Sequence, residues 1–146
     1  MTLSSRAIVN EARSWIGTPF VHQAVAKGAG CDCLGFLRGV WRELTGDSTP
    51  FIFDYHAHWF EHDPKERLLE GLRSYLIEET GPLQNGQIIL FRLFQKYPAQ
   101  HVGIVTQSGP KAIRFIHAIA GHGVVEVSLS PRWQRRIVAQ FRMKKV

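Results

Sequence analysis

Apolar residues recur at helical spacing in the first half of the chain. In residues 33–46 they lie three and four positions apart, which predicts an amphipathic helix ended by its last glycine. Residues 4–17 show a shorter stripe of the same kind, with serines available to cap it. A third helix is predicted over residues 63–79, because Asp63 can cap it and Pro64 suits its first position.

The second half of the chain changes to short apolar and β-branched runs separated by turn residues. Five of these runs are predicted strands, at residues 84–91, 100–106, 112–119, 123–129 and 135–143. Because helices precede a series of strands, the fold class expected is α+β, with N-terminal helices packed on a C-terminal antiparallel β-sheet. With no repeat or low-complexity linker, the 146 residues predict a single domain, 1–146.

Composition places the chain among ordinary soluble proteins. Hydrophobic residues make up 45% and charged residues 21%. The first residues hold no apolar run typical of a signal peptide, and no stretch approaches the roughly 20 apolar residues of a membrane span. We therefore expect a chain made in the cytoplasm, without a signal peptide and without membrane insertion.

The net charge of +6 has a local source near the C-terminus, in the stretch RWQRRIVAQFRMKK. Such a surface suits an anionic partner, but it is also typical of a solvated edge strand whose charges discourage aggregation. No nucleic-acid-binding motif accompanies the charge, so no nucleic-acid partner is predicted.

The two cysteines of the chain lie one residue apart in GAGCDCLGF. A disulfide between Cys31 and Cys33 is disfavoured by geometry and by a reducing cytoplasm. A zinc site needs about four ligands, and there is no second cysteine pair. Cys33 opens the predicted helix after Asp32, a good N-cap, and a helix N-terminus favours a thiolate. Cys33 is therefore a candidate nucleophile, with a buried structural cysteine as the alternative.

A cysteine nucleophile needs a histidine base that is itself oriented by a polar group. His101 and His117 lie on consecutive predicted strands, each eight residues from Gly109 in the turn signal SGP. A hairpin centred on that glycine would place them directly opposite each other, with Cβ atoms roughly 5 Å apart. This face is expected to meet the N-terminus of the Cys33 helix, with Gly103 leaving room for the helix to approach.

Three further histidines form the pattern H-x-H-x3-H at His56, His58 and His62. They could begin a metal cluster, but no firm fourth ligand lies nearby, and a solvated aromatic loop is the favoured interpretation. We predict no metal and no organic cofactor.

Together, GCDCLGF, the later HVGIV and FIHA, and ARSWIGTPF before the cysteines resemble the NlpC/P60 family of papain-like cysteine peptidases. The resemblance runs from about residue 6 to 145. Within that family, GTPFVHQAVAKGAGCDCLGFLRGVWRELTG and the inserted YHAHWFEHDPKERLLEGLRSYL are similar to the short peptidases of tailed phages and gene transfer particles.

The resemblance implies a papain-like fold and hydrolysis of amide bonds in the stem peptides of peptidoglycan, typically between γ-D-glutamate and diaminopimelate. It implies Cys33 as nucleophile, His101 as base and His117 as the residue that orients the base. Location in the tail of a virion or phage-like particle is also implied, with tail hub or tip proteins as partners. A related amidase that cuts between muramic acid and L-alanine is one alternative. Another is a tail subunit without catalysis, which would dock through its basic C-terminal strand and the loop around Trp59.

The sequence departs from the family pattern near the oxyanion site. Many members have a tyrosine after GTP, and its hydroxyl is thought to help hold the oxyanion, but here the residue is Phe20. His22 lies two positions on and could replace that donor. Asp32 is a candidate for contact with the free amine of the substrate.

Overall fold

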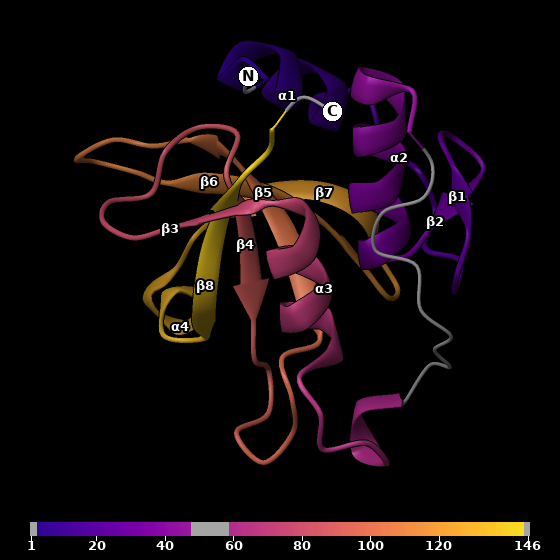
Figure 1. Ribbon diagram of the computed structural model, residues 1–146. Helices are drawn as coiled ribbons and strands as arrows, with labels where there is room; N and C mark the ends of the chain where they lie inside the picture. The colour runs from indigo at the N-terminus through magenta and orange to yellow at the C-terminus, as the bar shows by residue number, and fades with distance from the viewer. Residues whose placement is uncertain (1–2, 48–58, 145–146) are drawn as a thin grey trace.

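Three helices cover one face of a six-stranded antiparallel sheet in the computed structural model, which describes residues 3–47 and 59–144 (Figure 1). The strand order is β3-β8-β4-β5-β6-β7, and every neighbouring pair is antiparallel. The α+β prediction is therefore confirmed. The helices are α1 (Ser5–Arg13), α2 (Cys33–Thr45) and α3 (Arg67–Tyr75), and the strands are β3 (Ile77–Glu79), β4 (Ile88–Phe91), β5 (His101–Gln107), β6 (Arg114–Ile119), β7 (Gly123–Ser128) and β8 (Ile137–Arg142).

Helix α2 forms where its apolar stripe predicts it, and both of its ends are capped. The Asp32 side chain accepts a hydrogen bond of 2.7 Å from the backbone N–H of Gly35. At the other end Gly46 adopts the left-handed conformation, with φ of 78°. A Cβ at Gly39 would lie 2.2 Å from the ring of Trp15, so this glycine allows the tryptophan at the end of α1 to pack closely on α2. The fully buried tryptophan fixes the two helices against each other.

Helix α3 is shorter than predicted at both ends. Asp63 does not cap it; its carboxylate instead accepts from the backbone N–H of Lys65 at 3.0 Å and pairs with Arg67. At the C-terminal end, Ile77–Glu79 leaves the helix to form β3 beside β8. The predicted helix over 63–79 was wrong there because pairing with β8 satisfies the backbone groups that the local pattern assigned to a helix.

The hairpin of β5 and β6 also differs from its prediction. Ile104 lies opposite Ile116, a displacement of two residues from a hairpin centred on Gly109. The cause is a β-bulge between Val105 and Gln107 and a turn whose centre lies beyond that glycine. A displacement of two keeps every side chain on its predicted face, so the histidines share a face as diagonal rather than direct neighbours.

The two faces of the sheet pack against different partners. Val102, Ile104 and Ile116 join the core formed with α1, α2 and α3. The opposite face forms a smaller core with Phe91 and Phe115, and Trp133 packs against it. The expectation that Gly103 makes room for α2 was wrong, because a Cβ there would lie 2.8 Å from the Phe115 ring.

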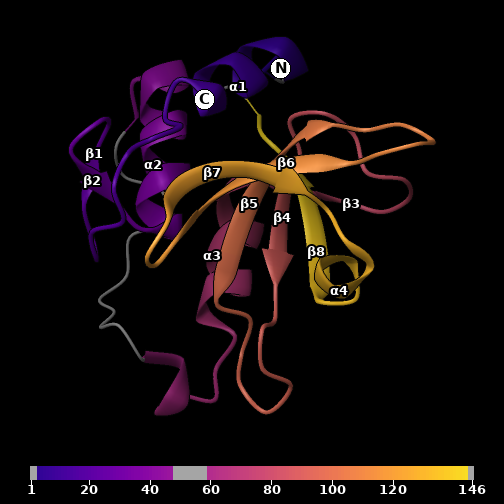
Figure 2. The same cartoon turned by 180° about the vertical axis from the view of Figure 1, so that it is seen from behind.

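Several short elements were not predicted. The segment expected to be a loop before Cys33 contains a two-stranded ribbon, β1 (Val25–Ala26) and β2 (Gly30–Cys31). A 3-10 turn, η1, spans Trp59–Glu61. Helix α4 (Pro131–Gln134) precedes β8 and is capped by Ser130 (Figure 2). Strand β8 lies between β3 and β4, so the interpretation of the basic C-terminal strand as a sheet edge was wrong.

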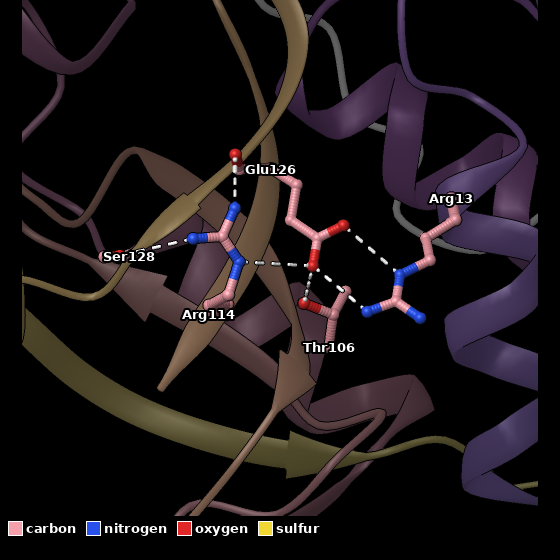
Figure 3. A network of polar contacts seen from close by, with 5 residues as sticks. All are labelled: Arg13, Thr106, Arg114, Glu126 and Ser128. Atoms are coloured by element: carbon pink, nitrogen blue, oxygen red, sulfur yellow. Dashed lines mark hydrogen bonds and ion pairs between the residues drawn. The ribbon is translucent and has the colours of Figure 1, made fainter. Parts of the chain in front are cut away.

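A polar network ties α1 to the sheet through Glu126 of β7 (Figure 3). Its carboxylate accepts from Arg13 at 3.2 and 3.1 Å, from Thr106 at 2.8 Å, and lies 3.6 Å from the Arg114 guanidinium. Arg114 also donates to the Ser128 hydroxyl at 3.3 Å. Burial acts to raise the pKa of Glu126, but the hydrogen bonds and the two guanidinium charges outweigh it and lower the pKa.

Candidate active site

Cys33 lies at the N-terminus of α2, beside the start of β5. Its Sγ is 3.9 Å from the backbone carbonyl oxygen of Gln100, toward which the thiol S–H points as a donor. Cys31 differs in setting, since it belongs to β2 and has 0% of its surface exposed. Both cysteines are free thiols, and only Cys33 is partly accessible. The structure thus separates two residues that are one position apart in sequence.

His101 and His117 form a buried hydrogen-bonded pair. The Nε2 of His101 lies 2.8 Å from the Nδ1 of His117, and 7% and 2% of their surfaces are exposed. The hydrogen-bond contact expected from the sequence is confirmed, despite the displaced register. Trp133 packs on both rings, with centroid distances of 5.8 Å to His101 and 5.1 Å to His117. The pairing leaves Nδ1 of His101 as the nitrogen available to exchange a proton with a neighbour.

Burial decides the protonation of these groups. It raises the pKa of Cys33 to about 12, with the charge of Asp32 adding to the effect, while backbone N–H groups of Val102 and Leu34 act in the opposite direction. Burial and the neighbouring His117 lower the pKa of His101 to about 3. Burial also lowers the pKa of His117 to about 4. The backbone N–H of Leu34 at the start of α2 thus acts in the expected direction, but burial outweighs it, so the expected net lowering of the Cys33 pKa is wrong. With these pKa values, Cys33 is a neutral thiol and both imidazoles are neutral near neutral pH.

One cavity of about 250 Å³ brings the predicted site residues together. His117 stands behind His101 and is not part of the wall. The other predicted site residues all line the cavity: Phe20, His22, Asp32, Cys33 and His101. The sequence-based grouping of these positions is thus reproduced by the fold, while their chemical roles stay predictions.

The carboxylate of Asp32 is largely committed to local structure. In addition to the hydrogen bond from the N–H of Gly35, this carboxylate accepts one of 2.7 Å from the backbone N–H of Gln23. The Nδ1 of His22 lies 3.7 Å from the same carboxylate. Gln23 reaches that carboxylate from a left-handed backbone conformation, with φ of 64°, which is uncommon for a residue other than glycine. Asp32 thereby fixes the turn that carries His22 as well as the start of α2.

Sequence reasoning missed most of the apolar wall of the cavity. Trp133 is positioned by α4, whose signal was available in the sequence as Ser130 followed by Pro131. Gln100 also lines the cavity, and its buried Nε2 has no hydrogen-bond partner among the residues that the structure describes. The remaining apolar wall comes from segments far apart in the chain: Leu34, Trp59, Phe60, Leu68, Leu93, Phe94, Ala118, Ile119 and Ala120.

The histidine cluster at 56–62 lies mostly outside the described residues, because His56 and His58 belong to the segment 48–58. Within residues 3–47 and 59–144, no group of three or more histidine, cysteine, aspartate or glutamate side chains is arranged to hold a metal ion. In the same ranges no helix has the length and apolar character needed to cross a membrane.

Comparison with known proteins links this geometry to solved structures. No protein-family model and no curated protein matches the chain. An NLP/P60-family protein similar to a lipoprotein, from Staphylococcus aureus, superposes with a TM-score of 0.66 and 21% identity, covering 100% of this chain and 44% of that one. Ly7917 gives 0.65 and 15%, covering 97% and 63%, and it has also been solved with the hydrolysing product of MDP.

A third solved structure, NlpC2 from Trichomonas vaginalis, gives a TM-score of 0.61 and 20% identity, covering 97% of this chain and 46% of that chain. The chain thus spans between 44% and 63% of the length of these three solved proteins. The likeness extends over nearly all of this sequence, helices and sheet alike. The chain has the fold of the NlpC/P60 proteins.

Proposed function

We propose that the chain hydrolyses amide bonds in the stem peptides of peptidoglycan, with Cys33 as nucleophile and His101 as base. The observation that carries this proposal is the shared cavity that Cys33 and His101 line, with His117 hydrogen-bonded behind His101. A cysteine at a helix N-terminus, a histidine beside it and a third polar group are the parts of an acyl-transfer site. The NlpC/P60 fold supports the assignment.

The resting protonation states set the order of events in the proposed mechanism. A substrate carbonyl binds in the cavity against the Cys33 thiol, and Nδ1 of His101 takes the thiol proton as sulfur attacks. The imidazolium that forms is held by its Nε2–H, which donates to Nδ1 of His117. Backbone N–H groups at the start of α2 face the developing oxyanion, and His22 lines the same cavity. His101 then protonates the leaving amine, and water hydrolyses the thioester.

The finer assignment concerns the bond and the place of action. We place the cut between γ-D-glutamate and diaminopimelate, and the chain in the tail of a phage or phage-like particle, in contact with tail hub or tip proteins. The support for both is the sequence resemblance around Cys33 and in the segment 55–76. In that setting the enzyme would open the cell wall locally.

Digestion of purified peptidoglycan with mass analysis of the fragments tests the proposal. The wild-type chain should release fragments cut within the stem peptide, and Cys33→Ala should lower the rate by ~10³-fold or more. Cys31→Ala is the matched control and should keep most activity, because Cys31 lies outside the cavity with 0% exposure.

Each alternative gives its own fragment pattern in the same experiment. Fragments cut between muramic acid and L-alanine would identify an amidase instead. Intact peptidoglycan with folded wild-type protein would contradict hydrolysis and favour a tail subunit without catalysis. Activity that survives in Cys33→Ala but not in Cys31→Ala would reverse the assignment of the nucleophile.

A further inference from the structure

The basic residues near the C-terminus separate into paired and unpaired groups. Arg142 of β8 forms an ion pair of 3.0 Å with Glu79 of the neighbouring strand β3. Arg132 and Arg135 are exposed, and in the part of the chain that the structure describes their side chains have no hydrogen bond or ion pair. Arg136 donates to the backbone oxygen of Arg132 at 3.0 Å and has no acidic partner there. Three guanidinium groups thus gather at α4 without a compensating carboxylate.

These arginines lie next to the candidate active site. Leu93 and Trp133 line the catalytic cavity and also a second cavity of about 280 Å³, whose remaining walls are Arg132 and Arg136. A third cavity continues from Leu93 past Arg135. Trp133 forms part of the wall between the catalytic cavity and the second cavity, and its ring also packs on His101. A substrate that leaves the catalytic cavity over Trp133 therefore enters a space lined by arginine.

The lining of this space has one sign of charge. Neither of the two cavities beyond Trp133 has an aspartate or glutamate in its described wall. Arg92, the other cation there, is already paired with Glu66 at 2.8 Å. By contrast, the catalytic cavity is mostly apolar, and the one carboxylate in its described wall, Asp32, accepts hydrogen bonds from backbone N–H groups. Among the described residues, the arginines beyond Trp133 are therefore the strongest candidates for binding an anionic group of the substrate.

We propose that Arg132, Arg135 and Arg136 form an anion subsite that binds a carboxylate of the substrate peptide. Resting on the proposed function, this assigns the substrate class more closely: a peptide with a free carboxylate beyond the scissile amide. The planar fork of a guanidinium matches a carboxylate with two parallel hydrogen bonds. A pocket that shares Leu93 and Trp133 with the catalytic cavity suits a group of the substrate better than an extended strand of nucleic acid, which would need a longer basic track.

The subsite predicts a preference between two peptides that differ only in charge. Two synthetic stem peptides, identical except that the carboxylates of one are carboxamides in the other, are compared by kcat/KM. The wild type should prefer the carboxylate peptide by about tenfold or more. In the double variant Arg132→Gln/Arg135→Gln this preference should largely disappear, because kcat/KM for the carboxylate peptide falls toward that for the carboxamide peptide.

The matched control removes the same charge elsewhere. Arg6→Gln/Lys111→Gln replaces two exposed cations outside all three cavities and should keep the preference. Binding of both peptides to Cys33→Ala, with and without the two arginine substitutions, is measured in parallel by calorimetry. This second readout does not depend on catalysis, so it separates the subsite from the proposed function.

The outcomes are distinct. Cleavage of both peptides at equal kcat/KM overturns the subsite and leaves hydrolysis standing. Arginine-dependent binding of the carboxylate peptide without cleavage supports the subsite and contradicts the proposed function. Equal loss of preference in the control variant would show a general charge effect and overturn the proposal. Displacement of the carboxylate peptide by a single-stranded oligonucleotide at lower concentration would make the arginines a nucleic-acid surface instead, and would also overturn it.

Discussion

The Glu126 network and the Cys33–His101–His117 site both involve strands of the same sheet, but the first holds charged groups and the second holds neutral ones. Glu126 accepts from Arg13 and Thr106, lies near a second guanidinium, and keeps a lowered pKa despite its burial. At the candidate site, burial raises the pKa of Cys33 and lowers that of His101, so both groups are neutral at rest.

The difference lies in the partners that each group receives. Guanidinium groups offset the desolvation of the Glu126 carboxylate, whereas the histidine rings face aromatic side chains and each other. One region uses a permanent charge pair to hold α1 on the sheet. The other holds neutral groups at rest, and in the proposed mechanism an ion pair forms only when Cys33 attacks the substrate.

The largest effect is expected from the histidine pair. His101→Ala removes the base and should lower kcat/KM by about 10²- to 10⁴-fold. His117→Ala should cost less, about 10- to 100-fold, because His101 keeps its place but loses the partner of its Nε2–H. Steady-state kinetics on a stem peptide would check both. A larger loss in His117→Ala than in His101→Ala would exchange the two roles.

The Glu126 network should affect stability and leave activity intact. Glu126→Gln leaves Arg13 and Arg114 without their common carboxylate and should lower the free energy of unfolding by about 1–2 kcal/mol. Chemical denaturation gives this value, and kcat/KM of the folded variant should match the wild type. Glu43→Gln, at an exposed position on α2, is the control and should change stability by less than about 0.5 kcal/mol. Activity lost with stability retained would show that the network belongs to the catalytic site.

Acid should destabilise the protein through the buried histidines. Their pKa values, about 3 for His101 and about 4 for His117, lie below the roughly 6.5 of an unfolded histidine, so the unfolded state binds more protons in between. The histidines' contribution to the free energy of unfolding is therefore complete above about pH 6.5. It is lost as the pH falls toward the folded-state pKa values of about 4 and about 3. Glu126 adds its loss only at still lower pH, below its ordinary value of 4.5. Unfolding curves across this range should fall less steeply for His117→Asn. Equal slopes for variant and wild type would contradict the lowered pKa of His117.

The sequence predicted the parts of the molecule whose signals are local. The order of helices followed by strands was sufficient to predict the fold class. The apolar stripe and the caps of α2 were sufficient to place Cys33 at a helix N-terminus, and alternation placed the side chains of β5 and β6 on their faces. Features that depend on distant partners were not predictable. The end of α3 is set by pairing of Ile77–Glu79 with β8, which is more than 50 residues away.

The candidate site shows the same division. The face shared by His101 and His117 followed from period-two alternation, which a net register displacement of two residues does not change. The resting charge of Cys33 depends on burial, which follows from the packing of Cys33 against the main core and from the cavity walls that distant segments supply. Trp133, which covers both histidines, could have been found only by placing α4 on the far face of the sheet.

A thiolate titration tests the resting state of the site most directly. The ultraviolet absorbance of the thiolate is recorded against pH for the wild type and for Cys33→Ala, and the difference reports Cys33 alone. We expect no thiolate near neutral pH and a signal that rises only in strongly alkaline solution, in line with a pKa of about 12. A thiolate signal at or below neutral pH that disappears in His101→Ala would show a preformed ion pair and would contradict a neutral resting site.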